Sequence, residues 1–154
     1  MTSPEERLGA LGLELPDVAA PVAAYVPAVR TGRYVYTAGQ LPLVNGKFPT
    51  AGKAGAEVSV GQASELARIC ALNALAAVTS VTGSLSAITR VVKVTGFVAS
   101  AAGFTGQPQV VNGASELLLE VFGDAGRHAR SAVGVAELPL NATVEVELIV
   151  EVAD

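Results

Sequence analysis

An arginine opens a run of otherwise small and apolar residues, Arg130–Ala136 (RSAVGVA), whose composition predicts a β-strand. Ala132 and Gly134 follow it on the same face of that strand and leave open space in front of its guanidinium. A planar guanidinium facing open space can bind a small carboxylate through two parallel hydrogen bonds. The competing interpretation is that Arg130 pairs with an acidic neighbour such as Glu151 and is purely structural.

Glu145, Glu147 and Glu151 lie on one face of a second predicted strand, opposite valine and leucine residues. They can form a solvated outer face, or one of them can act as a general acid or base. If the last two strands form a hairpin that turns after residue 140, Arg130 lies opposite Glu151 and shares a face with Glu145, roughly 20 Å away along the strand. A site that uses both Arg130 and Glu145 would then have to lie between subunits.

His128, in the segment GDAGRHARS, is the only side chain that ordinarily changes charge near neutral pH. It is a possible catalytic residue, but a lone histidine in a polar loop without an evident nucleophile favours a hydrogen-bonded surface role. Cys70 lies in an alanine-rich helical pattern and is expected to be a small core residue. One cysteine and one histidine cannot form a cysteine or multi-histidine metal site, so we expect no metal.

These residues must be positioned by a succession of helices and strands that capping signals and periodicity predict. Ser3–Glu6 (SPEE) starts a short helix that ends near Gly9 or Gly12, and a connector follows to about residue 20. We then predict a hairpin of strands over 25–30 and 33–38 around a Thr31-Gly32 turn, followed by an irregular loop to Glu57. The rest of the chain is predicted to form a helix over 59–81, a strand over 88–99, a helix over 107–122 and strands over 130–137 and 143–152.

The predicted order, β-β-α-β-α-β-β after the short helix, indicates one α+β domain over 1–154, with a mixed sheet and two main helices on one face. A composition of 51% hydrophobic and 16% charged residues excludes a disordered chain and favours association with further copies of the chain. The net charge of −4 argues against nucleic-acid binding. The charge-free stretch 69–89 is too polar for a membrane span, and the first residues lack the apolar core of a signal peptide, so we expect a cytoplasmic protein.

Several short motifs, taken together, are similar to a known family. They are Tyr25-Val-Pro, Thr37-Ala-Gly-Gln-Leu-Pro42, Val111-Asn112, the block from Ala129 to Pro139 (ARSAVGVAELP) and Val144-Glu-Val-Glu147. From about Pro21 to Val152 the chain resembles the Rid family, the reactive intermediate deaminases also called YjgF-type or L-PSP endoribonuclease proteins.

The resemblance implies a chorismate-mutase-like fold, a homotrimer with ligand clefts between subunits, and hydrolysis of small 2-imino and enamine acids to 2-keto acids and ammonia without a cofactor. It implies that Arg130 binds the substrate carboxylate and Glu145 positions water. Tyr25 and Asn112 would line the cleft, and the backbone at Gly39 and Ala132 would bind ligand.

The chain departs from the usual family pattern at Ala38, where a serine is common, and at Ala132, where a cysteine is frequent. It also has an N-terminal helix, a longer loop over 42–57 and the sequence GRHARS. These features indicate a divergent subgroup. An imine or enamine deaminase is the first interpretation, and a non-enzymatic binder or sensor of small carboxylate metabolites is the alternative. A ribonuclease fits the acidic pI poorly.

Overall fold

The computed structural model describes residues 2–18, 20–21 and 23–154, so the expected N-terminal connector is described only in part. Five strands form one mixed sheet, with three α-helices and three short 3₁₀ turns. The α-helices and strands are α1 (Pro4–Ala10), β1 (Ala28–Thr31), β2 (Tyr34–Thr37), α2 (Val60–Thr82), β3 (Ile88–Ala99), α3 (Gln107–Phe122), β4 (Ala129–Val135) and β5 (Val144–Val152).

The predicted element order is confirmed, and most boundaries differ by only one or two residues. The exception is the first hairpin, where β1 begins at Ala28, so Tyr25 lies in the irregular segment before the strand. Its turn is formed by Gly32 and Arg33, one residue later than predicted. The backbone at Gly32 is left-handed, with φ of 57°, a conformation that glycine adopts without steric penalty.

Helix α2 is the core helix, as its alanines predict. It starts at a capping box in which Ser59 and Gln62 bond reciprocally, and it ends at Gly83 in the left-handed conformation. Its length and hydropathy would also allow it to span a membrane, but 56% of its most apolar window is buried inside the protein. The small residues that it buries let it lie close to the sheet and to α3; among them are Ala63, Ala67, Ala71, Ala74 and Ala77.

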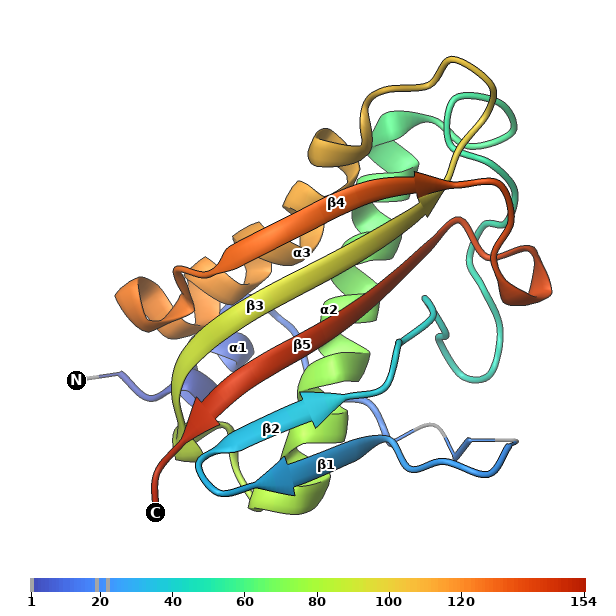
Figure 1. The fold of residues 1–154 in the computed structure, drawn as a ribbon. Helices are drawn as coiled ribbons and strands as arrows, with labels where there is room; N and C mark the ends of the chain where they lie inside the picture. Colours follow the sequence, from blue (N-terminus) through green and yellow to red (C-terminus); the bar gives the residue numbers. More distant parts are fainter. Residues whose placement is uncertain (1, 19, 22) are drawn as a thin grey trace.

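The sheet order is β1-β2-β5-β3-β4, and this corrects the expected hairpin between the last two strands. Strand β4 pairs in parallel with β3, while β5 lies between β2 and β3 and is antiparallel to both. Parallel neighbours need a crossover connection, and α3 supplies it between β3 and β4. Strand β4 is therefore an edge of the sheet, and its residues face β3 rather than β5 (Figure 1).

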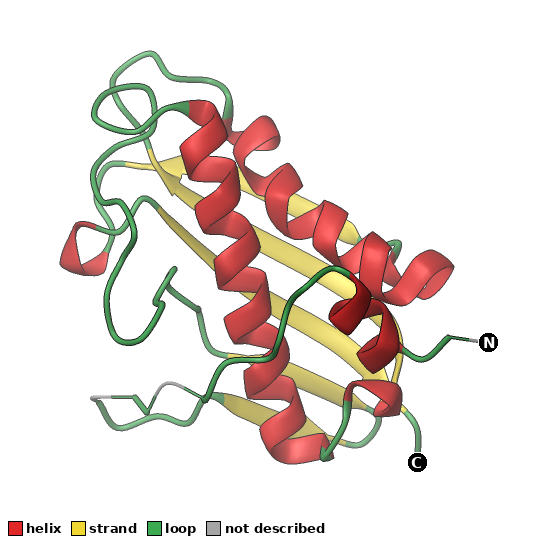
Figure 2. Ribbon diagram, turned by 180° about the vertical axis from the view of Figure 1, so that it is seen from behind, coloured by secondary structure: helices red, strands yellow, loops and turns green. Residues whose placement is uncertain are grey.

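The two faces of the sheet differ sharply. The helices cover one face, as Figure 2 shows, and there β5 buries its alternate residues, Val144, Val146, Leu148, Val150 and Val152. The opposite face, turned toward the viewer in Figure 1, has no helix over it. Strand pairing and burial place several large apolar side chains on this open face, namely Val29, Tyr34, Tyr36, Val92, Phe97, Val133 and Ile149.

Two glycines set how closely α3 approaches its neighbours. A Cβ atom on Gly113 would lie 1.9 Å from the carbonyl oxygen of Ser64, so only glycine permits this crossing of α2 and α3. A Cβ on Gly96 of β3 would lie 2.4 Å from the Val111 side chain. The close contact at Val111 brings the next residue of the helix, Asn112, toward the edge strand β4.

Candidate functional site

The Arg130 side chain leaves β4 on the helix-covered face and is held by α3 of the same chain. Its Nη1 donates to Asn112 Oδ1 at 2.8 Å and to Ser115 Oγ at 3.1 Å, and its Nη2 donates to the Pro108 carbonyl at 3.1 Å. Asn112 and Ser115 are three residues apart, so they share one face of α3. The structure thus brings two predicted site residues, Arg130 and Asn112, into direct contact.

None of these acceptors carries a negative charge. Among the described residues Arg130 has no acidic partner within ion-pair distance, and no hydrogen bond involves its Nε. The expected alternative, a structural pair with Glu151, is wrong: Glu151 lies across β3 from β4 and binds Arg33 at 3.1 Å. A guanidinium that is oriented but not neutralised keeps Nε–H and one Nη2–H for a carboxylate.

A residue that the sequence analysis did not single out, Ser115, links Arg130 to His128. Ser115 Oγ lies 2.9 Å from His128 Nε2, and His128 Nδ1 lies 2.6 Å from the Gly126 carbonyl oxygen. His128 is therefore half-buried and bonded on both ring nitrogens, rather than in a solvated loop. Ser115, His128 and Arg130 line one hollow of about 320 Å³ together with Leu119 and Arg127. We call Arg130, Asn112, Ser115 and His128 the arginine cluster.

Three other predicted residues gather elsewhere. Tyr25 and Gly39 line a second hollow of about 170 Å³. A Cβ atom on Gly39 would lie 2.8 Å from both Cδ and Oε2 of Glu145, so the Gly39 backbone lies directly against that carboxyl group. The Gly39 N–H makes no hydrogen bond to another described residue and is available to a ligand or a water molecule. We call Tyr25, Gly39 and Glu145 the glutamate cluster.

The segment that carries Gly39 is held on both sides. Gln40 exchanges two backbone hydrogen bonds with Val146 of β5, at 2.8 and 3.0 Å. The buried side chain of Asn73 on α2 donates to the carbonyls of Leu41 and Leu43, at 3.0 and 3.1 Å. Because hydrogen bonds from both α2 and β5 hold this segment, Gly39 keeps its place beside Glu145.

Glu145 is half-buried on the open face of the sheet. Burial raises the pKa of its carboxyl group from the ordinary value of 4.5, and the nearby charge of Glu147 raises that pKa further. A carboxylate with a raised pKa is a stronger base, which suits a group that orients or deprotonates water.

The two clusters lie on opposite faces of the sheet, and this corrects the expected common face. Arg130 pairs with Val94 of β3, which points into the core, whereas Glu145 pairs with Phe97 of β3, which points to the open face. Strand β3 separates β4 from β5. Arg130 and Glu145 of one chain therefore do not face a common ligand.

The remaining candidates have clear positions. Ala132 follows Arg130 on the helix-covered face of β4 and packs against the core. Cys70 is buried, as predicted, and burial raises its thiol pKa well above the ordinary value. Within the part of the chain that the structure describes, no three His, Cys, Asp or Glu side chains gather as metal ligands.

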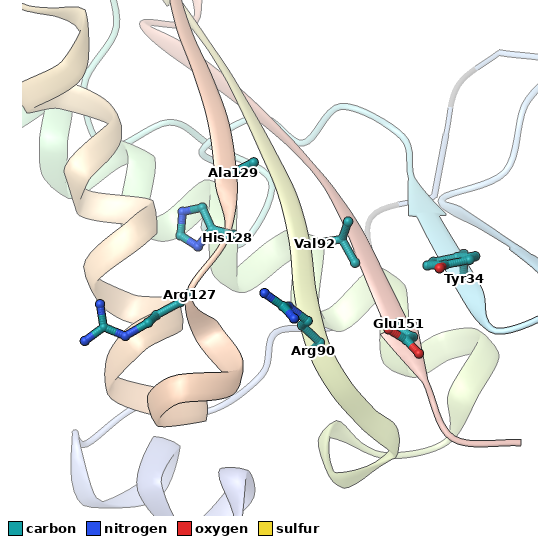
Figure 3. A pocket seen from close by; sticks show the side chains of 7 residues that line it. All are labelled: Tyr34, Arg90, Val92, Arg127, His128, Ala129 and Glu151. Atoms are coloured by element: carbon teal, nitrogen blue, oxygen red, sulfur yellow. The ribbon is translucent and has the colours of Figure 1, made fainter.

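A wider hollow of about 460 Å³ opens beside the start of β4 (Figure 3). It contains His128 but none of the other predicted site residues, and Arg127 extends away from it. Its one acidic residue, Glu151, is already paired with Arg33. The chemistry that the sequence predicts therefore concentrates in the two clusters and not in this hollow.

The raised pKa of Glu145 predicts a pH-dependent gain in stability for Glu145→Gln. The folded state binds the Glu145 proton more tightly than the unfolded state, so the ionised carboxyl lowers the free energy of unfolding as pH rises through its folded pKa. Urea denaturation should show Glu145→Gln more stable than wild type near pH 7, with the difference fading below about pH 4.5. The exposed Glu65 of α2 provides the control, since Glu65→Gln should show no such gain. A Glu145→Gln variant less stable than wild type at pH 7 would contradict this assignment.

Comparison with known proteins identifies the family of the chain. A protein-family model described as "YjgF/chorismate_mutase-like, putative endoribonuclease" matches residues 5–152. "Protein TCP17" from Trypanosoma cruzi is 44% identical over 146 residues, which cover 94% of this chain and 91% of that protein. The crystal structure of Atu1372 from Agrobacterium tumefaciens, a protein of unknown function, is 47% identical with a TM-score of 0.91 over 97% of this chain and 92% of its own.

Solved structures separate into nearer and more distant relatives. An endoribonuclease-like protein from Shewanella oneidensis is 38% identical with a TM-score of 0.94, covering 97% of this chain and 99% of its own. The YjgF gene product of Escherichia coli is 27% identical with a TM-score of 0.65, covering 88% and 93%. E. coli TdcF, solved with bound serine, shares the fold at 24% identity and a TM-score of 0.66, covering 88% and 94%. The chain therefore belongs to the YjgF/chorismate-mutase-like family, the Rid or L-PSP proteins, and lies nearer to the Atu1372 branch than to YjgF itself.

Proposed function

We propose that this protein hydrolyses small 2-imino and enamine acids to 2-keto acids and ammonia, in clefts between the subunits of a homotrimer. The observation that carries the proposal is the state of Arg130: three neutral acceptors orient its guanidinium, and no described carboxylate neutralises it. A 2-imino acid supplies the missing anion and carries its reactive carbon next to that carboxylate.

The chemistry needs only positioning and one proton acceptor. The imine carbon is already electrophilic, so a water molecule held beside it can add to give a carbinolamine. Glu145 would accept one proton from the water and pass it to the imine nitrogen as the carbinolamine forms. It would then carry the remaining hydroxyl proton to the same nitrogen, so that the C–N bond breaks, ammonia leaves and the ketone remains. The pKa of Glu145, raised by burial and by Glu147, favours this transfer. We expect no metal and no cofactor to be needed.

The division of the site supports assembly between subunits. One chain carries the arginine cluster on the helix side of the edge strand β4 and the glutamate cluster beside the open face. That open face exposes Tyr34, Tyr36, Val29 and Val133, each more than 40% accessible. Covering such a surface with further copies would bury apolar area and bring Arg130 of one subunit toward Glu145 of the next.

A small ligand with an amino-acid skeleton is compatible with this fold, since the TdcF structure holds serine. The hollow at the arginine cluster, about 320 Å³, has room for a molecule of that size. The metabolic setting that we propose is cytoplasmic, where enzymes that form imino acids from amino acids would provide the substrate.

The second candidate is binding of small carboxylates without turnover. The observation that favours it is that the arginine cluster is complete within one chain, whereas the glutamate cluster stands apart from it. The discriminating experiment is a coupled assay in which an amino-acid oxidase generates imino acids in the presence and absence of this protein. Faster loss of the imino acid supports the deaminase, and binding of keto acids without faster loss supports the binder.

Replacement of Arg130 should abolish binding of a small 2-keto acid and leave the fold intact. Loss of a charge-assisted bidentate contact should weaken binding by about 2–5 kcal/mol, which isothermal calorimetry resolves. Arg127→Ala is the matched control, because it removes the adjacent positive charge, whose side chain is 76% exposed and bonds only Asp124 among the described residues. Equal binding by wild type and Arg130→Ala would refute the carboxylate site.

Replacement of Glu145 should separate catalysis from binding. Glu145→Gln keeps the shape of the side chain but removes the proton acceptor, so kcat should fall by about 10²–10⁴-fold. Affinity for a keto acid should stay near the wild-type value, because Arg130 provides that contact. The coupled assay measures kcat, and calorimetry measures affinity. Wild-type turnover by Glu145→Gln would show that another group handles the proton.

A further inference from the structure

We propose that Ser115 and His128 are part of the ligand site and act together as a proton-carrying pair. In this proposal a carboxylate bound to Arg130 favours protonation of His128, and the Ser115 hydroxyl of the protonated pair then turns from His128 to the ligand. The inference rests on the proposed carboxylate site. It adds Ser115 and His128 to that site and couples ligand binding to protonation of His128.

The hydrogen-bond partners fix the donors and acceptors of this pair when His128 is neutral. The Gly126 carbonyl can only accept, so His128 Nδ1 must carry a proton in its 2.6 Å contact. The neutral imidazole then presents a lone pair at Nε2, and the hydroxyl of Ser115 must donate to it across 2.9 Å. Ser115 Oγ also accepts from Arg130 Nη1 at 3.1 Å. The one hydroxyl proton of Ser115 is therefore committed to His128.

Protonation of His128 reverses this bond. The imidazolium donates from Nε2 to Ser115 Oγ, which then accepts from His128 and Arg130 at once. The Ser115 hydroxyl group no longer donates to His128, and its proton can rotate toward a ligand in the hollow that Ser115, His128 and Arg130 line. Protonation thus adds one O–H donor and one positive charge to the site.

The surrounding charges couple this protonation to ligand binding. The charged side chains that share a hollow with His128 are Arg90 of β3, Arg127 and Arg130 on the β4 side, and Glu151 of β5, while Tyr34 of β2 is the other titratable group there. Glu151 is bound to Arg33, and Asp124 pairs with Arg127 at 3.4 Å. Arg90 and Arg130 have no acidic partner among the described residues. A carboxylate bound by Arg130 adds a negative charge near His128, so ligand binding and protonation of His128 favour each other.

The position of His128 is built into the fold. A Cβ atom on Gly126 would lie 2.3 Å from the Leu118 carbonyl oxygen of α3, so only glycine lets this turn lie against the helix. The carbonyl of the buried Gly126 then contacts Nδ1 of His128, and Nε2 of His128 contacts Ser115, which lies on α3 one turn before Leu118. Both ring nitrogens are therefore directed by α3 and the turn that follows it.

The test is calorimetry of 2-oxobutyrate, a keto acid that cannot be deaminated, in buffers of different ionisation enthalpy. Wild type should take up about half a proton per ligand near pH 6.5 and almost none at pH 8, and its affinity should rise on the order of tenfold between about pH 8 and pH 5. His128→Ala should bind without this uptake and without the rise. Loss of the uptake in His128→Ala assigns the proton to His128, and the exposed-carboxyl control Glu65→Gln should keep the uptake. Wild-type binding without proton uptake, or unchanged uptake in His128→Ala, overturns the proposal.

Ser115→Ala tests the released hydroxyl separately. It should bind nearly as well as wild type at about pH 8 and several-fold more weakly at about pH 5, because only protonated His128 frees that hydroxyl. An equal loss at both pH values would overturn the switch. Since the chain has one histidine, nitrogen NMR of the untagged protein should show the Nδ1–H tautomer without ligand. Absence of any binding heat would instead refute the carboxylate site proposed above, which keeps the two failures distinct.

Discussion

The positive charge of Arg130, oriented by helix α3 and left without a counter-charge, is the feature on which the functional architecture depends. Asn112, Ser115 and the Pro108 carbonyl fix the guanidinium with neutral acceptors. A carboxylate in their place would orient it equally well but would compete with any anionic ligand. The crossover from β3 through α3 to β4 makes this arrangement possible, because it places the arginine strand at the sheet edge and against that helix.

The same topology keeps the base away from the arginine. Insertion of β5 between β2 and β3 puts Glu145 on the open face, where Gly39 can lie against its carboxyl group. The glutamate remains half-buried and next to Glu147, and it retains a raised pKa at some expense of stability. A single chain thus carries two half-sites directed away from each other, and our account of the function joins them through a symmetric assembly.

Local signals in the sequence were sufficient for the elements but not for their pairing. The capping box at Ser59, the glycine at 83 and the β-branched run over 88–99 each specify one element, and these predictions are confirmed. The prediction that Arg130 shares a face with Glu145 was wrong. It assumed that the last two consecutive strands pair, whereas the helical crossover makes β4 a partner of β3. Alternation within RSAVGVA is compatible with either neighbour, so no local pattern could decide between them.

The residues of the candidate site could also be predicted only in part. Arg130 and Glu145 could be singled out by their charge and their place on predicted strands, whereas Asn112 and Gly39 could be singled out only by the family resemblance. Ser115 could not, since a serine in an apolar helix carries no signal until the strand beneath it is known. Its position three residues after Asn112 would have indicated it once α3 had been placed over β4. His128 has its role only through Ser115, so its environment could not be found from sequence alone.

The measurement that most directly tests the central claim is mixing of two inactive variants. If each site takes Arg130 from one subunit and Glu145 from its neighbour, co-expression of Arg130→Ala and Glu145→Gln chains creates some sites with both residues intact. Random assembly into trimers should restore about a quarter of the wild-type sites, and imino-acid hydrolysis should recover to that extent. Copurification of differently tagged chains verifies that mixed assemblies form. Mixed assemblies with no more activity than the two parent variants would show that the two clusters do not share a site between subunits.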